Sequence, residues 1–132
     1  MAAEPEHAFQ YTLLRVVPSL PRGEALNVGV VLYCRRLGFL AARTQLDRER
    51  LHALDPELDL EQLARHLQGV ERVAAGDPAA GAIAALDRSE RFGSLSAPAS
   101  SLIQPSPVHT GLCADAEETL ERLFAELVAS PD

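Results

Sequence analysis

Apolar and polar residues alternate along the first third of the chain in the manner of β-strands. Residues 9–17 are rich in β-forming residues and stop at Pro18, and residues 25–34 and 39–44 repeat the pattern. Only short turn segments join these runs, and short loops can connect only antiparallel neighbours. The pattern therefore predicts an antiparallel meander of three strands. We expect one face of the second strand to carry four apolar side chains: Leu26, Val28, Val30 and Leu32.

Helical spacing replaces strand alternation after residue 46. Each predicted helix starts at an aspartate, whose carboxylate can accept a hydrogen bond from the first turn. These four aspartates are Asp47, Asp59, Asp77 and Asp115. The third helix, with Pro78 at its first position, is expected to run to about Leu86. The last helix carries an apolar stripe at helical spacing, formed by Leu120, Leu123, Phe124, Leu127 and Val128.

The order of the elements predicts the fold class. Residues 87–100 are expected to be irregular, and residues 101–104 to form a short strand before a loop that carries His109. Strands, then helices, then a late strand and a terminal helix indicate an α+β fold. We expect an antiparallel sheet of three to four strands with helices packed on one face. A single domain is expected over residues 9–129, between flexible termini at 1–8 and 130–132.

Charge and composition limit the classes of function. The chain has 12 basic and 19 acidic residues, a formal net charge of −7. Without a basic stripe, nucleic-acid binding is not expected, because neutralising phosphates requires clustered cations. No apolar run approaches the roughly 20 residues needed to span a bilayer, so no membrane partner is expected. All basic residues are arginine, which we interpret as the mark of a GC-rich bacterial genome.

The two cysteines, Cys34 and Cys113, stand alone without the spacing of a redox or zinc motif. The first seven residues are acidic and polar, unlike a secretory signal peptide. Reduced thiols and a cytoplasmic location are therefore expected.

Two polar segments beside apolar strands, residues 18–32 and residues 104–112, hold the candidate chemistry. Polar loops held by a rigid scaffold commonly carry function. Guanidinium groups there can bind anions, and an imidazole can bind phosphate or transfer a proton. The candidate ligand-binding residues are Arg15, Arg22, Glu24, Asn27, Gln104 and His109.

Each candidate also has a structural interpretation. Arg22 and Glu24 can form a surface ion pair worth at most about 1 kcal/mol. Arg15 can brace the sheet, and His109 can hold its loop through backbone hydrogen bonds. Ser106 lacks the strained turn that exposes a serine nucleophile, and the scattered histidines do not supply the three or four ligands of a zinc site. No metal or cofactor is expected, and the residues leave open whether the protein is an enzyme.

Taken together, these motifs resemble the bacterial domain-of-unknown-function family 3037. The resemblance covers roughly residues 9–128 and has no established activity attached to it. It rests on Tyr11, Arg15, Pro18, Arg22-Gly23-Glu24, Asn27-Val28-Gly29-Val30 and the run from Ser100 to Leu112. The resemblance implies neighbouring genes that encode HipA-like kinases, and it therefore implies such a kinase only as a candidate partner.

Two hypotheses of function follow. The first is a non-catalytic interaction or accessory module of the bacterial cytosol, which binds a partner protein such as a HipA-like kinase through its N-terminal hairpin. The alternative is a small enzyme or ligand-binding domain for a phosphorylated or anionic compound, which requires the six candidate residues to converge. On that basis we expect His109 to contact Arg22 or Glu24, directly or through water.

Overall fold

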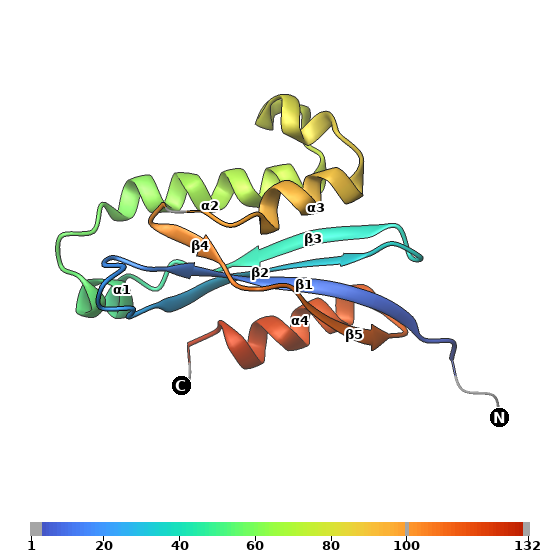
Figure 1. The fold of residues 1–132 in the computed structure, drawn as a ribbon, viewed down its shortest axis with the longest axis horizontal. Coiled ribbons are helices and arrows are strands. Elements are labelled where there is room, and N and C mark those ends of the chain that lie inside the picture. The colour runs from blue at the N-terminus through green and yellow to red at the C-terminus, as the bar shows by residue number, and fades with distance from the viewer. Residues whose placement is uncertain (1–3, 100, 131–132) are drawn as a thin grey trace.

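One antiparallel sheet organises the molecule (Figure 1). The computed structural model describes residues 4–99 and 101–130. The strands are β1 (His7–Val16), β2 (Leu26–Cys34), β3 (Phe39–Thr44), β4 (Ile103–Pro105) and β5 (His109–Cys113), and the helices are α1 (Arg48–Leu54), α2 (Leu60–Ala75), α3 (Arg88–Ser96) and α4 (Ala116–Leu127). The strand order is β3-β2-β1-β4, and β5 also pairs with β1. The predicted α+β class and antiparallel sheet are confirmed.

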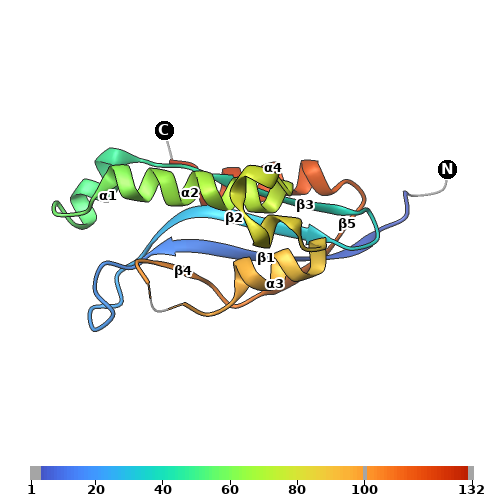
Figure 2. The same cartoon turned by 90° about the horizontal axis from the view of Figure 1, so that it is seen from above.

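Helices cover both faces of this sheet, not the single face that we expected. α2 and α3 lie on one face and α4 on the other (Figures 1 and 2). The reason is visible in β2, which is almost entirely buried. A strand that is apolar on both sides needs a cover on both sides.

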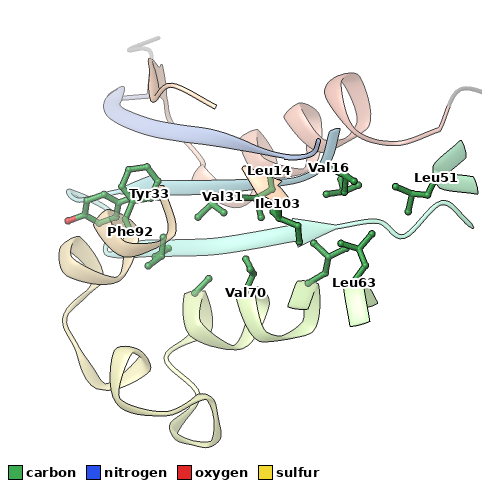
Figure 3. Close-up of a cluster of buried hydrophobic side chains, with 13 residues drawn as sticks. Leu14, Val16, Val31, Tyr33, Leu51, Leu63, Val70, Phe92 and Ile103 are labelled. Atoms are coloured by element: carbon green, nitrogen blue, oxygen red, sulfur yellow. The ribbon is translucent and has the colours of Figure 1, made fainter. Parts of the chain in front are cut away.

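Each face has its own apolar cluster. On the α2 face, side chains from the sheet meet α2 and α3 (Figure 3), including Leu14, Val31, Tyr33, Leu63, Val70 and Phe92. On the α4 face, Phe9, Val30 and Leu32 pack with Leu120 and Leu123. The apolar stripe predicted for the last helix therefore packs on the sheet as expected.

A β-bulge changes the alternation of β2. The register between β1 and β2 shifts by one residue at Val28, so two successive residues lie on the same side of the strand. As a result Leu26 and Val28 pack on the α2 face, whereas Val30 and Leu32 pack on the α4 face. The single face predicted for these four residues is wrong for this reason. The bulge also turns Asn27 toward α4.

Aspartate caps begin the helices, as predicted, except that the segment after Asp77 does not form an α-helix. Asp47, Asp59 and Asp115 each accept a hydrogen bond from the backbone N–H three residues later. Asp77 opens only two short 3-10 turns, Pro78–Ala80 and Ala82–Ala85. Gly81, at φ +96°, separates them, because that backbone conformation cannot continue a right-handed helix.

The segment expected to be irregular contains α3 instead. Its cap, Asp87, accepts a hydrogen bond from the N–H of Glu90. Asp115 and Glu118 at the start of the last helix have the same spacing as Asp87 and Glu90, so this signal was present in the sequence.

The ordered structure extends slightly past the expected domain limits. β1 begins at His7, and the N–H of Ser130 donates to Oε1 of Gln45 at 3.1 Å. The rest of the termini expected to be flexible includes residues 1–3 and 131–132, which lie outside the described residues. None of the described helices is long and apolar enough to cross a membrane.

Candidate functional site

β4 and β5 form a single broken strand along β1. Arg15 lies opposite Gln104 in the first part, and Tyr11 lies opposite His109 in the second. The register changes by one residue between them, which is the signature of a bulge. Both parts pair with the same strand, so the second polar segment of the sequence is an edge of the sheet (Figure 1).

Ser106 holds the break in this strand. Its N–H donates to the carbonyl of Leu13 at 2.7 Å, and its Oγ accepts from the N–H of Leu13 at 2.9 Å. The hydroxyl of Thr12 donates to the carbonyl of Ser106 at 2.8 Å. Because Ser106 is only 6% exposed and its groups are already bonded, the serine supports the backbone and is not an accessible nucleophile.

His109 lies in strand β5, whereas we expected it in a loop. Its ring stacks on Tyr11 with centroids 5.1 Å apart, and Tyr11 stacks in turn on Phe9 at 6.0 Å. The ring of Phe9 lies over Gly111, where an added Cβ would be 2.6 Å from it. The three rings follow the α4 face of β1 and β5, and the imidazole at their end is exposed.

A polar row crosses the sheet on the same face. Asn27, Arg15 and Gln104 are register partners on β2, β1 and β4. Nδ2 of Asn27 donates to the carbonyl of Leu127 at 3.0 Å, which satisfies one free carbonyl at the end of α4. Asn27 therefore has a structural role that joins the sheet to this helix.

Arg15 is the charged member of the row. Its Nη2 donates to the carbonyl of Pro105 at 3.3 Å, while its Nε is buried without a hydrogen-bond partner. Among the described residues, no carboxylate lies within ion-pair distance of it. The side chain thus braces β4 and retains an uncompensated positive charge beside half-exposed surface.

We call this surface the open sheet face. It is the α4 side of β1, β4 and β5 together with Asn27, which lies on β2 opposite Arg15, and it remains open because α4 packs mainly against β2 and β3. Its residues are Tyr11, Leu13, Arg15, Asn27, Gln104 and His109. Four of the six residues predicted from the sequence therefore lie on one surface.

The other two predicted residues lie in the loop between β1 and β2. Nε of Arg22 lies 2.5 Å from Oε1 of Glu24, and both side chains are more than half exposed. This contact lowers the pKa of Glu24 and raises that of Arg22. With Leu54 and Asp55 of the adjoining α1 segment, the pair lines a hollow of about 140 Å³.

The expected contact of His109 with Arg22 or Glu24 does not form, and that prediction is wrong. His109 pairs with Tyr11, whereas the hairpin loop begins after Val16. Five residues of strand separate these positions by about 17 Å, and Figure 1 shows the hairpin and β5 at opposite ends of the sheet. Of the second segment, Gln104 comes nearest, since it lines a second hollow with residues 17–21.

Two further classes of site can be assessed in the described residues. No group of three or more histidine, cysteine and acidic side chains is placed to hold a metal ion within residues 4–99 and 101–130. Cys34 and Cys113 are both buried. Burial and the neighbouring Cys34 raise the pKa of Cys113, so this thiol stays protonated and unreactive near neutral pH.

Sequence reasoning missed Tyr11 and Leu13 as parts of the open sheet face. Both were assigned to an apolar strand without a partner for their exposed side. The signal that places them there is the pairing of β1 with β5, which brings Tyr11 beside His109. A prediction of this long-range pairing would have been needed to find them.

Comparison with known proteins identifies a family. The family model described as "Protein of unknown function (DUF3037)" matches residues 11–128. No curated protein and no solved structure matches this chain.

Proposed function

Because the chain belongs to the DUF3037 family, whose description names no activity, we propose a function from its own surface. We infer that the protein is a non-catalytic interaction or accessory module of the bacterial cytosol, which binds a partner protein through the open sheet face. The observation that carries this proposal is that α4 packs mainly against β2 and β3 and leaves the side chains of this face half exposed or exposed.

The residue types on the open sheet face suit a protein interface. Tyrosine and arginine are enriched among the residues that contribute most to binding, and their effect is largest where water is excluded. Tyr11 and Leu13 offer apolar area beside the unpaired guanidinium of Arg15. A partner that covers them would gain both apolar contact and an ion pair.

The alternative, a ligand-binding domain or small enzyme for an anionic compound, has less support. It needs the six predicted residues in one pocket, but Arg22 and Glu24 line one hollow and Gln104 lines another. Neither hollow includes Arg15, Asn27 or His109.

We propose a HipA-like kinase as the partner. Coexpression of the tagged chain with a HipA-like kinase from the same organism, followed by copurification, tests this directly. Arg15→Gln and His109→Ser should each weaken capture by about tenfold, which corresponds to about 1.4 kcal/mol. Gln68→Ala, on the exposed side of α2, is the matched control and should bind as the wild type does.

The other results are equally informative. If Arg22→Ala loses binding while Arg15→Gln does not, the hairpin loop is the contact surface. If the kinase does not copurify with the wild-type chain, the proposed partner is wrong.

A further inference from the structure

The edges of the sheet are protected to different degrees. A free edge offers unpaired N–H and C=O groups to any other strand, so most proteins block such edges. β3 is flanked by α2 on one face and α4 on the other. β4 contains Pro105, which has no N–H to offer. β5 has neither of these protections in the described structure.

Hydrogen bonds beside β5 establish which of its backbone groups point outward. Because Leu13 exchanges hydrogen bonds with Ser106, the odd-numbered residues of β1 direct their backbone toward this edge. The β5 residues opposite them are His109, Gly111 and Cys113. In an antiparallel ladder the bonded and unbonded directions alternate, so Thr110 and Leu112 direct their N–H and C=O groups away from the sheet.

The side chains along this edge do not discourage pairing. Edge strands are commonly protected by inward-pointing charges or lysines, but β5 carries no acidic or basic side chain apart from the imidazole of His109. Leu112 is 64% exposed, the highest value among the large apolar residues described, and Val108 just before the strand is 41% exposed. Another strand would cover this apolar surface while it satisfies the free backbone groups.

We propose that β5 accepts an extended segment of a partner protein as an added strand, and that this segment carries lysine or arginine where it passes the end of β5 at Cys113. This inference rests on the proposed function, because it assigns the mode by which an interaction module holds its partner. Strand addition obtains its affinity from backbone hydrogen bonds and its selectivity from alternate side chains.

Charge identifies the chemistry of the segment. Four exposed carboxylates lie close along the chain to this end of the edge. Glu6 precedes His7, the register partner of Cys113, and Asp115, Glu117 and Glu118 follow Cys113. None of them forms an ion pair in the described part of the chain. A basic side chain on the added strand would gain their attraction, whereas a second copy of this chain would bring its own net charge of −7. The charges therefore favour a basic partner segment over self-association.

Amide hydrogen exchange of the ¹⁵N-labelled full chain tests the free edge first. In dilute solution the amides of Thr110 and Leu112 should exchange rapidly, while those of Gly111 and Cys113 should be protected by their bonds to β1. Protection of Thr110 and Leu112 in the dilute chain would show that the edge is already occupied and would overturn the proposal.

Two acetylated and amidated peptides then serve as probes. One has the sequence Lys-Val-Thr-Val-Thr-Val, and its control has glutamate in place of lysine. At four times the Kd of the basic peptide, Thr110 and Leu112 should exchange about fivefold more slowly, since only the free fraction exchanges. Equal slowing by both peptides would reject the basic chemistry, and no slowing by either would reject strand addition.

Proline provides a matched pair of variants. Leu112→Pro removes an outward N–H, a position at which edge strands tolerate proline, and should abolish the effect of the basic peptide. Leu112→Ala keeps the N–H and should retain most of it. If Leu112→Pro does not fold, the exchange data on the wild-type chain still decide the question.

The remaining outcomes separate this inference from the proposed function. If the kinase copurifies but the amides of Thr110 and Leu112 still exchange rapidly in the complex, the partner binds elsewhere and strand addition is wrong. If the basic peptide protects them and the kinase does not bind, the edge is a binding site and the proposed partner is wrong. Slowing that grows with protein concentration alone would show that a second copy occupies β5, contrary to the proposal.

Discussion

Gly111→Ala tests whether the ring of Phe9 depends on the absence of a side chain in β5. A Cβ at this position would lie 2.6 Å from Cζ and 2.7 Å from Cε1 of Phe9, whereas carbon atoms in contact are normally about 3.5–4.0 Å apart. The ring is 5% exposed and stacked on Tyr11, so it cannot move away without disturbing its neighbours.

The expected magnitude follows from two opposing effects. Overpacking of this kind destabilises by about 1–3 kcal/mol. Removing glycine from a strand returns about 0.5–1 kcal/mol, because the unfolded chain becomes less flexible. We therefore expect Gly111→Ala to lower the free energy of unfolding by about 1 kcal/mol, and by at most about 2.5 kcal/mol.

Gly69→Ala is the matched control. Gly69 lies inside α2, and a Cβ added there would meet no atom of a neighbouring residue within 4 Å. The same substitution should there raise the free energy of unfolding by about 0.5–1 kcal/mol. Urea denaturation monitored by circular dichroism measures both variants.

A double-mutant cycle isolates the contact. In a Phe9→Leu background, Gly111→Ala should be neutral or stabilising, because the clashing ring atoms are gone. Gly111→Ala that is as stabilising as Gly69→Ala in the wild-type chain would refute the packing of Phe9 on Gly111. An unchanged cost in the Phe9→Leu background would place the strain elsewhere.

Three further predictions concern the core, the broken strand and pH. Leu123→Ala should cost about 2–5 kcal/mol in urea denaturation, since Leu123 is 6% exposed on the face of α4 that packs on the sheet. Ser106→Ala should cost about 1–3 kcal/mol in the same assay, because the N–H of Leu13 loses its acceptor. The hydroxyl of Ser130 and the N–H of Arg50 lower the pKa of Asp47, so its charged form contributes stability above the unfolded pKa of about 3.9. That contribution should be lost as pH falls through the lower folded pKa, and thermal unfolding of Asp47→Asn at pH values below about 4 should show a weaker pH dependence than the wild type.

Local signals in the sequence were sufficient to predict most strands and helices. The features that they did not predict depend on long-range strand pairing and packing. Strand alternation and aspartate caps placed the first three strands and three of the helices. The same local signals could not show that β2 contains a bulge, because a bulge depends on the register with β1. They also could not show that α4 returns to the opposite face of the sheet from α2.

The candidate site shows the same division. Residue chemistry identified Arg15, Asn27, Gln104 and His109, and the sheet brings all four to one face. The expected contact between the two polar segments failed because strand pairing holds the hairpin and β5 at different positions along β1. The residue types indicated which side chains were candidates for the site, but only the register of the strands determines which of them lie side by side.

Several polar residues of the two segments have structural roles. This reduces the number of residues that remain candidates for binding a partner. Asn27 joins the sheet to the end of α4, and Ser106 supports the break between β4 and β5. A Cβ at Gly29 would lie 3.2 Å from the carbonyl oxygen of Arg43, so this position is restricted by backbone of the neighbouring strand.

When these structural residues are set aside, a small set remains whose polar or apolar groups do not stabilise the fold. The charge of Arg15 has no acidic partner among the described residues, the imidazole of His109 is exposed, and Leu112 is exposed beside free backbone groups. A partner stabilises such a surface when it covers the apolar area and supplies an acidic group for the guanidinium. His109 and Leu112 share β5, and β5 pairs along the same strand that carries Arg15, so we expect these three residues to mark the region where a partner protein binds.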